Sequence, residues 1–170
     1  MKNFTQPVYY LMLAWILSCC TTTRFYIVRH AEKACGDCAS CGLVVPAGRD
    51  RALALRDSLL SKGIDTIFTS ECLRTQMTAR PLADQIHKTI SIYQTARLAS
   101  FITTLKGLNG NKSILVVGHS DQIPVIIDSL VHRHIIIGND DFDNLFIITR
   151  HHFLKTTIEL KSTTYGPPSP

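Results

Sequence analysis

The chain of 170 residues is long enough to fold as one domain around a hydrophobic core. Apolar residues make up 45% and charged residues 18%, a composition that is typical of globular proteins and excludes an intrinsically disordered chain. The formal net charge of +5 suits an anionic partner, but the basic residues are scattered without a Lys/Arg run, so we expect a local anion pocket and no nucleic-acid partner.

The start of the chain is typical of an export signal. Residues 1–18 carry a single charge, and their apolar stretch at 8–17 is too short for the roughly 20 residues of a membrane-spanning helix. A small residue precedes Cys19, as in bacterial lipoprotein signals, so we expect cleavage before Cys19 and a lipid on its thiol, with Cys20 as the alternative site. Residues 19–23 would form a short tether in the bacterial cell envelope, and the lipid would be the only membrane contact. A buried N-terminal helix is the competing interpretation.

Strand-like and helix-like segments alternate after this signal, over a predicted domain at 24–161. Apolar runs predict strands, and longer segments with helical spacing predict the helices between them. The strands are expected at 24–29, 65–69, 90–93 and 113–118, and the helices at 47–62, 72–87, 97–107 and 121–131. This alternation predicts an α/β fold, a three-layer α/β/α sandwich with a mostly parallel sheet.

The end of the chain has a different pattern. The segments NLFIITR and FLKTTIELK flank His151 and His152 and predict an antiparallel hairpin at the edge of the sheet. Residues 162–170, which end in GPPSP, are expected to be a disordered tail. The acidic stretch 139–146 lacks the glycine and the terminal glutamate of a calcium loop, so we interpret it as a polar lead-in to the hairpin.

Three of the predicted strands end in residues that suit phosphate chemistry. The three ends carry Arg29 with His30, Ser70 with Arg74, and His119. The carboxyl ends of parallel strands meet at one edge of a sheet, so these side chains should converge there. Arginine offers forked donors that match phosphate oxygens, and a neutral imidazole is a good nucleophile near neutral pH. The sequence therefore predicts a phosphate pocket in which a histidine attacks phosphorus, with no metal or cofactor.

The same segments resemble the histidine phosphatase superfamily, the phosphoglycerate mutase-like proteins. VRHAEK resembles its first signature, TSECLRTQMTARPLA its second and LVVGHS its third, in the family's order. The resemblance implies that His30 is the nucleophile and that Arg29, Arg74 and His119 bind the phosphate. It further implies a small exported bacterial phosphatase that hydrolyses a small phosphomonoester or phosphoramidate through a phosphohistidine.

Two departures from the family pattern bear on this interpretation. Ala31 stands where the family usually has glycine after the nucleophile. Many members supply a glutamate as general acid between the second and third motifs, and IYQTARLASF contains no acid here. Glu32, Glu71 and Asp121 are the candidates, and Asp121 is placed with His30 and His119 among the catalytic residues. Without an acid, the chain would be a non-catalytic phospho-ligand-binding module.

A serine esterase is a second alternative, because GHSDQ resembles a nucleophile elbow with Ser120 as the nucleophile. His151 or His152 would be the base, with an acid chosen from Asp128, Asp140, Asp141 and Asp143. The elbow lacks its last glycine, and no oxyanion-hole segment is present. This alternative also leaves the arginines at the other strand ends without a role.

Cys35, Cys38 and Cys41 lie three residues apart in CGDCASC. No fourth cysteine completes a metal-binding pattern, and an exported protein is expected to use such cysteines for disulfides. Pairing of Cys35 with Cys41 would hold the segment beside His30. Pairing with Cys72 is the alternative and would connect two segments of the predicted site. Connectivity cannot be deduced from spacing.

Overall fold

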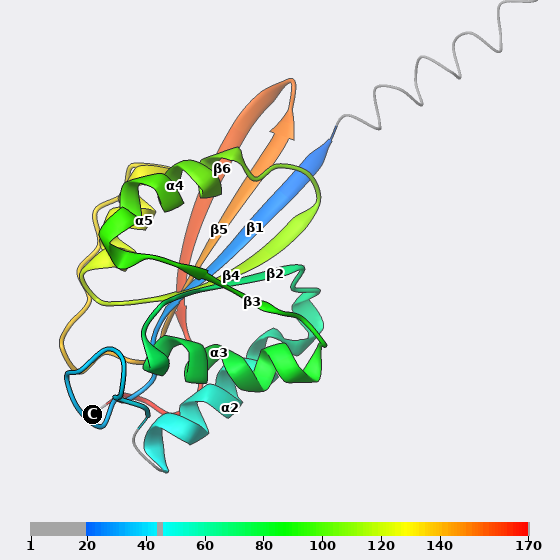
Figure 1. The fold of residues 1–170 in the computed structure, drawn as a ribbon. Coiled ribbons are helices and arrows are strands. Elements are labelled where there is room, and N and C mark those ends of the chain that lie inside the picture. Colours follow the sequence, from blue (N-terminus) through cyan, green and yellow to red (C-terminus); the bar gives the residue numbers. More distant parts are fainter. Residues whose placement is uncertain (1–19, 44–45, 170) are drawn as a thin grey trace, which may run out of the picture.

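The computed structural model describes residues 20–43 and 46–169, and Figure 1 shows a central sheet with helices on both faces. The sheet has six strands in the order β3-β2-β4-β1-β5-β6. The strands are β1 (Thr21–Arg29), β2 (Thr66–Ser70), β3 (Ile90–Tyr93), β4 (Lys112–Gly118), β5 (Asn144–Phe153) and β6 (Lys155–Thr164). Neighbours from β3 to β1 pair in parallel, whereas β5 pairs antiparallel with both β1 and β6. The predicted α/β fold and its antiparallel edge hairpin are confirmed.

The helices lie in two layers. They are α2 (Ala47–Leu59), α3 (Leu73–Gln85), α4 (Leu98–Gly107) and α5 (Gln122–Val131), with short 3-10 turns η1 (Leu60–Lys62) and η2 (Thr95–Arg97). Figure 1 shows α2 and α3 together on one face of the sheet and α4 and α5 on the other. This arrangement is the predicted three-layer sandwich, with helix bounds close to those expected from the spacing of apolar residues.

The continuous apolar run of β1 is explained by burial on both faces of the sheet. Phe25 and Ile27 pack into the core beneath α4 and α5, whereas Tyr26 and Val28 pack into the core beneath α2 and α3. A parallel strand that is covered on both sides cannot alternate between apolar and polar residues. The run therefore ends where the cores end, at Arg29.

The structure corrects the predicted tether. β1 begins at Thr21, because Thr21 pairs with β5 and Thr23 pairs with both β4 and β5. Residues 21–23 are therefore part of the sheet and not of a tether. The predicted signal peptide at 1–18 and the predicted lipidation site, Cys19, lie outside the described residues.

The prediction of a disordered tail at 162–170 is also wrong for the described residues. β6 continues to Thr164, and the Tyr165 side chain is buried in the core beneath α2 and α3. The Tyr165 N–H donates to the Asp143 carbonyl at 2.9 Å, and the Ser169 hydroxyl donates to the Asp143 carboxylate at 2.9 Å. The proline-rich composition indicated disorder, but these hydrogen bonds and the buried tyrosine attach the segment to the domain.

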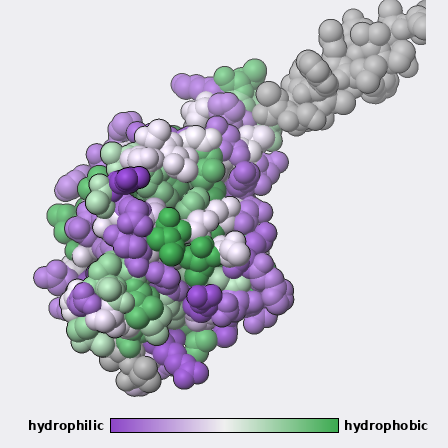
Figure 2. Space-filling model, viewed as in Figure 1, coloured by the Kyte–Doolittle hydropathy of each residue, from purple (hydrophilic) through white to green (hydrophobic). Residues whose placement is uncertain are grey.

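Figure 2 shows hydrophilic residues over much of one face of the molecule, with separate hydrophobic patches between them. Isolated apolar residues on a surface are normal for a folded domain. Among the described residues, no helix has both the length and the apolar character needed to span a bilayer.

Candidate active site

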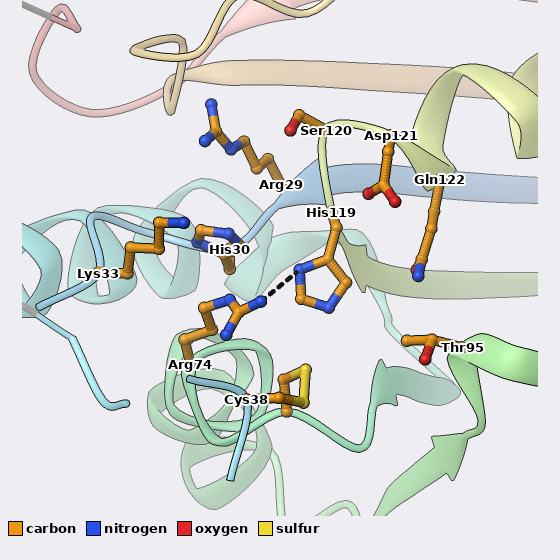
Figure 3. A pocket seen from close by; sticks show the side chains of 11 residues that line it. Arg29, His30, Lys33, Cys38, Arg74, Thr95, His119, Ser120, Asp121 and Gln122 are labelled. Carbon is orange, nitrogen blue, oxygen red and sulfur yellow. Dashed lines mark hydrogen bonds between the residues drawn. A yellow bond between two sulfur atoms is a disulfide. The ribbon is translucent and has the colours of Figure 1, made fainter. Parts of the chain in front are cut away.

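The predicted residues converge on a pocket at the carboxyl ends of β1, β2 and β4 (Figure 3). Arg29, His30, Arg74, His119 and Asp121 all line it. Its volume is about 320 Å³, near the lower end of the range of about 300–1,000 Å³ for small-molecule sites. The pocket can hold a small ligand or the end group of a larger one.

His30 is held as a neutral imidazole with one free nitrogen. Its backbone N–H donates to the Gly118 carbonyl at 3.0 Å, which continues the pairing of β1 with β4 beyond Arg29. Its Nδ1–H donates to the Ala31 carbonyl at 2.7 Å, so Nε2 carries no proton. Burial lowers the pKa of His30 to about 3, well below its ordinary value, so the ring stays neutral near pH 7. This is the state of a nucleophile.

Both ring nitrogens of His119 have partners. A guanidinium can only donate, so His119 Nδ1 accepts from Arg74 Nη2 at 3.4 Å, and its Nε2–H donates to Ser70 Oγ at 2.8 Å. Thr75 Oγ1 lies 2.9 Å from Ser70 Oγ and extends the network into α3. Burial, followed by the charge of Arg74, lowers the pKa of His119 to about 4. The His119 ring lies edge-on to the His30 ring, with 5.3 Å between the centroids.

The two arginines contribute positive charge and buried donors. Arg74, on α3, donates from Nη1 to the Asp37 carbonyl at 3.3 Å, and its Nε has no partner among the described residues. Arg29 Nε is likewise buried and without a partner there. A buried N–H without an acceptor costs about 1–3 kcal/mol, a cost that oxygens of a bound anion would remove. The pocket therefore favours an anion.

Arg29 has a second role that the sequence did not indicate. Its Nη1 donates to three backbone carbonyls of one loop, those of Gly138, Asn139 and Asp141, at 2.9, 2.7 and 3.1 Å. Its guanidinium also stacks on the Phe142 ring, 4.2 Å from the centroid. Arg29 thus holds the loop at 138–142, whose Phe142 ring lies 6.1 Å from the His30 ring between centroids, and only part of its guanidinium is free for a ligand.

Substitution Arg74→Ala is expected to weaken vanadate binding by roughly tenfold to a hundredfold, because it removes a charged donor to the oxyanion and the contact to His119. Isothermal titration calorimetry measures the affinity directly. Arg80→Ala is the matched control, since Arg80 is on the same helix with a side chain that is 62% exposed. An unchanged vanadate affinity in Arg74→Ala would show that the anion binds elsewhere.

Of the three candidate general acids, only Asp121 lines the pocket. Glu32 accepts from Arg51 Nε and Nη2 at 2.8 and 2.7 Å, and this buried ion pair joins the segment after His30 to α2. Glu71 accepts from the backbone N–H and hydroxyl of Thr95. The Thr95 hydrogen bonds hold the pKa of Glu71 below its ordinary value against the opposing effect of burial. Glu32 and Glu71 therefore position segments around the site.

Asp121 immediately precedes α5, and its side chain makes no capping hydrogen bond to that helix. Figure 3 shows its carboxylate beside His119 on the side of the pocket away from Lys33. Gln122, which follows it, is buried and accepts from the Tyr93 hydroxyl at 3.0 Å. The Asp121 carboxylate is therefore held near the pocket by its backbone, and its oxygens form no hydrogen bond with any described residue.

The predicted disulfide between Cys35 and Cys41 is wrong, and the alternative, pairing with Cys72, is confirmed. Cys38 is bonded to Cys72, and among the described cysteines Cys35 and Cys41 are free, although the Cys35 N–H points at the Cys41 sulfur. Cys38 and Cys72 face each other because the Leu73 N–H donates to the Cys38 carbonyl at 3.0 Å. This contact between two segments distant in sequence cannot be read from the regular cysteine spacing. The disulfide lines the pocket (Figure 3).

Cys38→Ser is expected to lower the free energy of unfolding by about 2–4 kcal/mol, because it opens a covalent loop between residues 34 positions apart. It should also weaken vanadate binding, since the Asp37 carbonyl that holds Arg74 would lose its anchor. Thermal denaturation and calorimetry measure the two effects. Cys20→Ser is the control, because Cys20 is exposed and free before β1. Equal stability of the two variants would contradict a structural role for the disulfide.

The geometry contradicts the serine esterase alternative. Ser120 lines the pocket, but His151 pairs with Thr22 at the other end of β1, and its ring contacts the Thr22 hydroxyl at 3.0 Å. Seven residues of strand separate Thr22 from Arg29, a distance of about 23 Å. His152 lies one residue farther along, opposite Thr21. Neither histidine can take a proton from Ser120.

Two features of the site were not identified from the sequence. Lys33 lines the pocket and was missed, although its position three residues after His30 could have identified it as a site residue. The loop that Arg29 holds had no detectable signal, because it contributes backbone carbonyls, which any residue type possesses. The acidic stretch that contains this loop was interpreted as a polar lead-in to the hairpin, and the structure shows that its carbonyl groups also contact an arginine.

Comparison with known proteins agrees with the fold. The sequence model of the histidine phosphatase superfamily (branch 1) matches residues 25–95. The structure is similar to that of the protein assigned as phosphohistidine phosphatase SixA from Agrobacterium tumefaciens, with 16% identity, a TM-score of 0.58 and coverage of 83% of this chain and 98% of that one. No curated protein sequence matches the chain significantly.

Two further solved structures share the fold. One is the protein histidine phosphatase SixA complexed with tungstate, with 14% identity, a TM-score of 0.61 and coverage of 83% of this chain and 96% of that one. The other is a mycobacterial glucosyl-3-phosphoglycerate phosphatase, with 12% identity, a TM-score of 0.60 and coverage of 84% and 99%. At these identities the similarity establishes the fold alone.

Proposed function

Because the chain belongs to the histidine phosphatase superfamily, we propose that it hydrolyses a small phosphomonoester or phosphoramidate through a phosphohistidine on His30. One observation carries the proposal: the hydrogen bond from His30 Nδ1 to the Ala31 carbonyl leaves Nε2 unprotonated in a pocket with two arginines. A neutral nucleophile beside buried positive charge is the arrangement that phosphoryl transfer requires.

The reaction proceeds in two displacements. His30 Nε2 attacks phosphorus, the bond to the leaving oxygen or nitrogen breaks, and Asp121 gives that atom its proton. Asp121, now a carboxylate, takes a proton from water as the water attacks the phosphohistidine, and inorganic phosphate leaves. Arg74 and Arg29 offset the charge on the phosphoryl oxygens in both steps. The side chains of this pocket thus supply the nucleophile, the acid and the positive charge.

The substrate class follows from the size and polarity of the pocket. A volume of about 320 Å³ accommodates a phosphoryl group with a small attached group. A phosphoramidate needs protonation of its leaving nitrogen, whereas the aryloxide of an aryl phosphate leaves readily without a proton. The similarity to the SixA structures supports inclusion of phosphoramidates, among them phosphohistidine, in this class.

The function is tested with p-nitrophenyl phosphate and with free phosphohistidine, assayed in EDTA with the purified protein. We expect hydrolysis of both and an acid-labile, alkali-stable phosphoenzyme after rapid denaturation. A protein that binds vanadate but hydrolyses neither compound would be the non-catalytic phospho-ligand-binding module of the same fold. Loss of hydrolysis in EDTA that is restored by a divalent cation would contradict a metal-independent mechanism.

We also propose that the protein is exported and lipid-anchored in a bacterial cell envelope, as the sequence of residues 1–19 predicts. A disulfide between Cys38 and Cys72 supports an oxidising compartment. β1 starts near the proposed anchor and ends at the pocket, so the pocket would open away from the membrane. Labelling with palmitate in a bacterial host tests the anchor: Cys19→Ser should lose the label and Cys20→Ser keep it. The opposite result would place the lipid on Cys20.

A further inference from the structure

Lys33 is a cation in the pocket whose charge the fold does not use. Among residues 20–43 and 46–169, its ammonium forms no hydrogen bond and no ion pair. The neighbouring Glu32 is already paired with Arg51 of α2. Figure 3 shows Lys33 beside His30, on the opposite side of the pocket from Asp121. No carboxylate in the described structure therefore neutralises it.

The backbone of Lys33 is fixed in place. Lys33 forms an isolated antiparallel bridge with Leu43, and the next N–H, that of Ala34, donates to the Gly42 carbonyl at 3.1 Å. Consecutive side chains of an extended segment point to opposite sides. Because Glu32 is directed at α2, Lys33 is directed away from that helix and lines the pocket. The ammonium thus extends from a positioned segment over the site.

The other cations are already partly committed to the protein. Arg74 donates to His119 and to the Asp37 carbonyl, and Arg29 donates to the loop at 138–141. Together they carry two positive charges, which a phosphate monoester dianion balances. Burial and Arg74 lower the pKa of His119, and Lys33 makes a smaller contribution in the same direction, so its charge reaches into the site. The positive charge of Lys33 is left without an anion.

We propose that Lys33 binds a second anionic group of the substrate, a carboxylate or a further phosphate, and so selects small phosphorylated substrates with two negative groups. The inference rests on the proposed phosphatase function and adds the substrate class. Lys33 would act on affinity and not on the bond-breaking step, because the His30 nucleophile and the Asp121 acid are separate groups.

Non-hydrolysable phosphonates test this inference whether or not the protein turns over. The probes are phenylphosphonate and the three isomers of phosphonobenzoate, which add a carboxylate at the ortho, meta or para position. Isothermal titration calorimetry at low salt gives each dissociation constant. We expect the wild-type protein to bind at least one isomer roughly tenfold more tightly than phenylphosphonate, as a charged hydrogen bond would provide.

Lys33→Ala should remove this advantage while leaving phenylphosphonate affinity within about twofold. Lys33→Arg should retain most of the advantage because it keeps the charge. Lys112→Ala is the control, since Lys112 is exposed at the start of β4, about 20 Å of strand from Gly118. An advantage that persists in Lys33→Ala would overturn the inference. Equal weakening of all four probes would also overturn it, because Lys33 would then bind the transferred phosphate.

A kinetic comparison separates this inference from the proposed function. Phenyl phosphate and the matching carboxyphenyl phosphate are compared as substrates. Lys33→Ala should raise KM for the carboxylated compound alone, with kcat unchanged. If the wild-type protein binds the phosphonobenzoate selectively but hydrolyses neither ester, the phosphatase function fails and the Lys33 contact stands. If it hydrolyses both esters with one KM and shows no phosphonate selectivity, the Lys33 contact fails and the phosphatase function stands.

Discussion

Replacing His30 with alanine is expected to lower kcat by roughly 10⁴-fold or more and to abolish the trapped phosphoenzyme. His30 Nε2 is the free imidazole nitrogen in the pocket, whereas both nitrogens of His119 are occupied by Arg74 and Ser70. The second histidine of the site therefore cannot replace it as the phosphoryl acceptor. Hydrolysis of p-nitrophenyl phosphate at saturation measures the loss.

The control for His30→Ala is His152→Ala, which alters an exposed histidine at the far end of β5 and should keep full activity. Vanadate affinity and the melting temperature of His30→Ala show whether the pocket and the fold survive, since Arg74 and the β1–β4 pairing are untouched. Retention of more than about a tenth of wild-type kcat in a folded His30→Ala protein would contradict the phosphohistidine mechanism.

Replacing Asp121 with asparagine is expected to have the second largest effect, and one that depends on the leaving group. For an alkyl phosphate, whose alkoxide needs a proton, kcat/KM should fall by about 10²–10⁴-fold. For p-nitrophenyl phosphate, whose p-nitrophenolate leaves readily without a proton, the fall in kcat/KM should be far smaller, because this quantity reports phosphoryl transfer to His30 and not the later attack by water. Asp121 is the carboxylate that lines the pocket, and its oxygens make no capping bond to α5. Steady-state kinetics over a series of leaving groups measure the change.

The pH dependence of kcat tests the neutral state of the nucleophile. His30 must be neutral, and its pKa of about 3 means that acid inactivates the nucleophile only near that pH, well below the ordinary histidine range. Asp128→Asn, which alters an exposed carboxylate on α5, the helix that follows Asp121, is the control for Asp121→Asn. Equal losses of kcat/KM for all leaving groups in Asp121→Asn would exclude Asp121 as the acid.

The positions of the candidate catalytic groups were predictable because strand ends are predictable. The apolar run of β1 is buried by helices on both faces of the sheet. The first charged side chain after the run therefore has to appear where this burial ends. Arg29 and His30 occupy that position, and His119 occupies the same position after β4. Parallel pairing then aligns the two ends, with Arg29 opposite Gly118.

The role of each candidate acid was not predictable. Glu32, Glu71 and Asp121 all lie near strand ends in the sequence, yet Glu32 is paired with Arg51 and Glu71 with Thr95. Each partner comes from another part of the chain, and an ion pair depends on distances that no residue pattern encodes. The disulfide partner of Cys38 was not predictable for the same reason, because the pairing depends on where α3 begins relative to the segment after β1.

The sequence by itself determined the α/β alternation, the order of the strands along the chain and the residues at the strand ends. These features depend on hydrophobic periodicity and on turn-forming residues, which are local properties. Tertiary structure alone decided which polar groups remain free. Packing paired Glu32 with Arg51, occupied both nitrogens of His119 and attached the segment after β6 to Asp143. Within residues 20–43 and 46–169, it left His30 Nε2 and Lys33 without partners. Local sequence patterns place a side chain at an edge of the sheet. Whether that side chain is free to contact a ligand or is paired within the fold depends on contacts between distant segments.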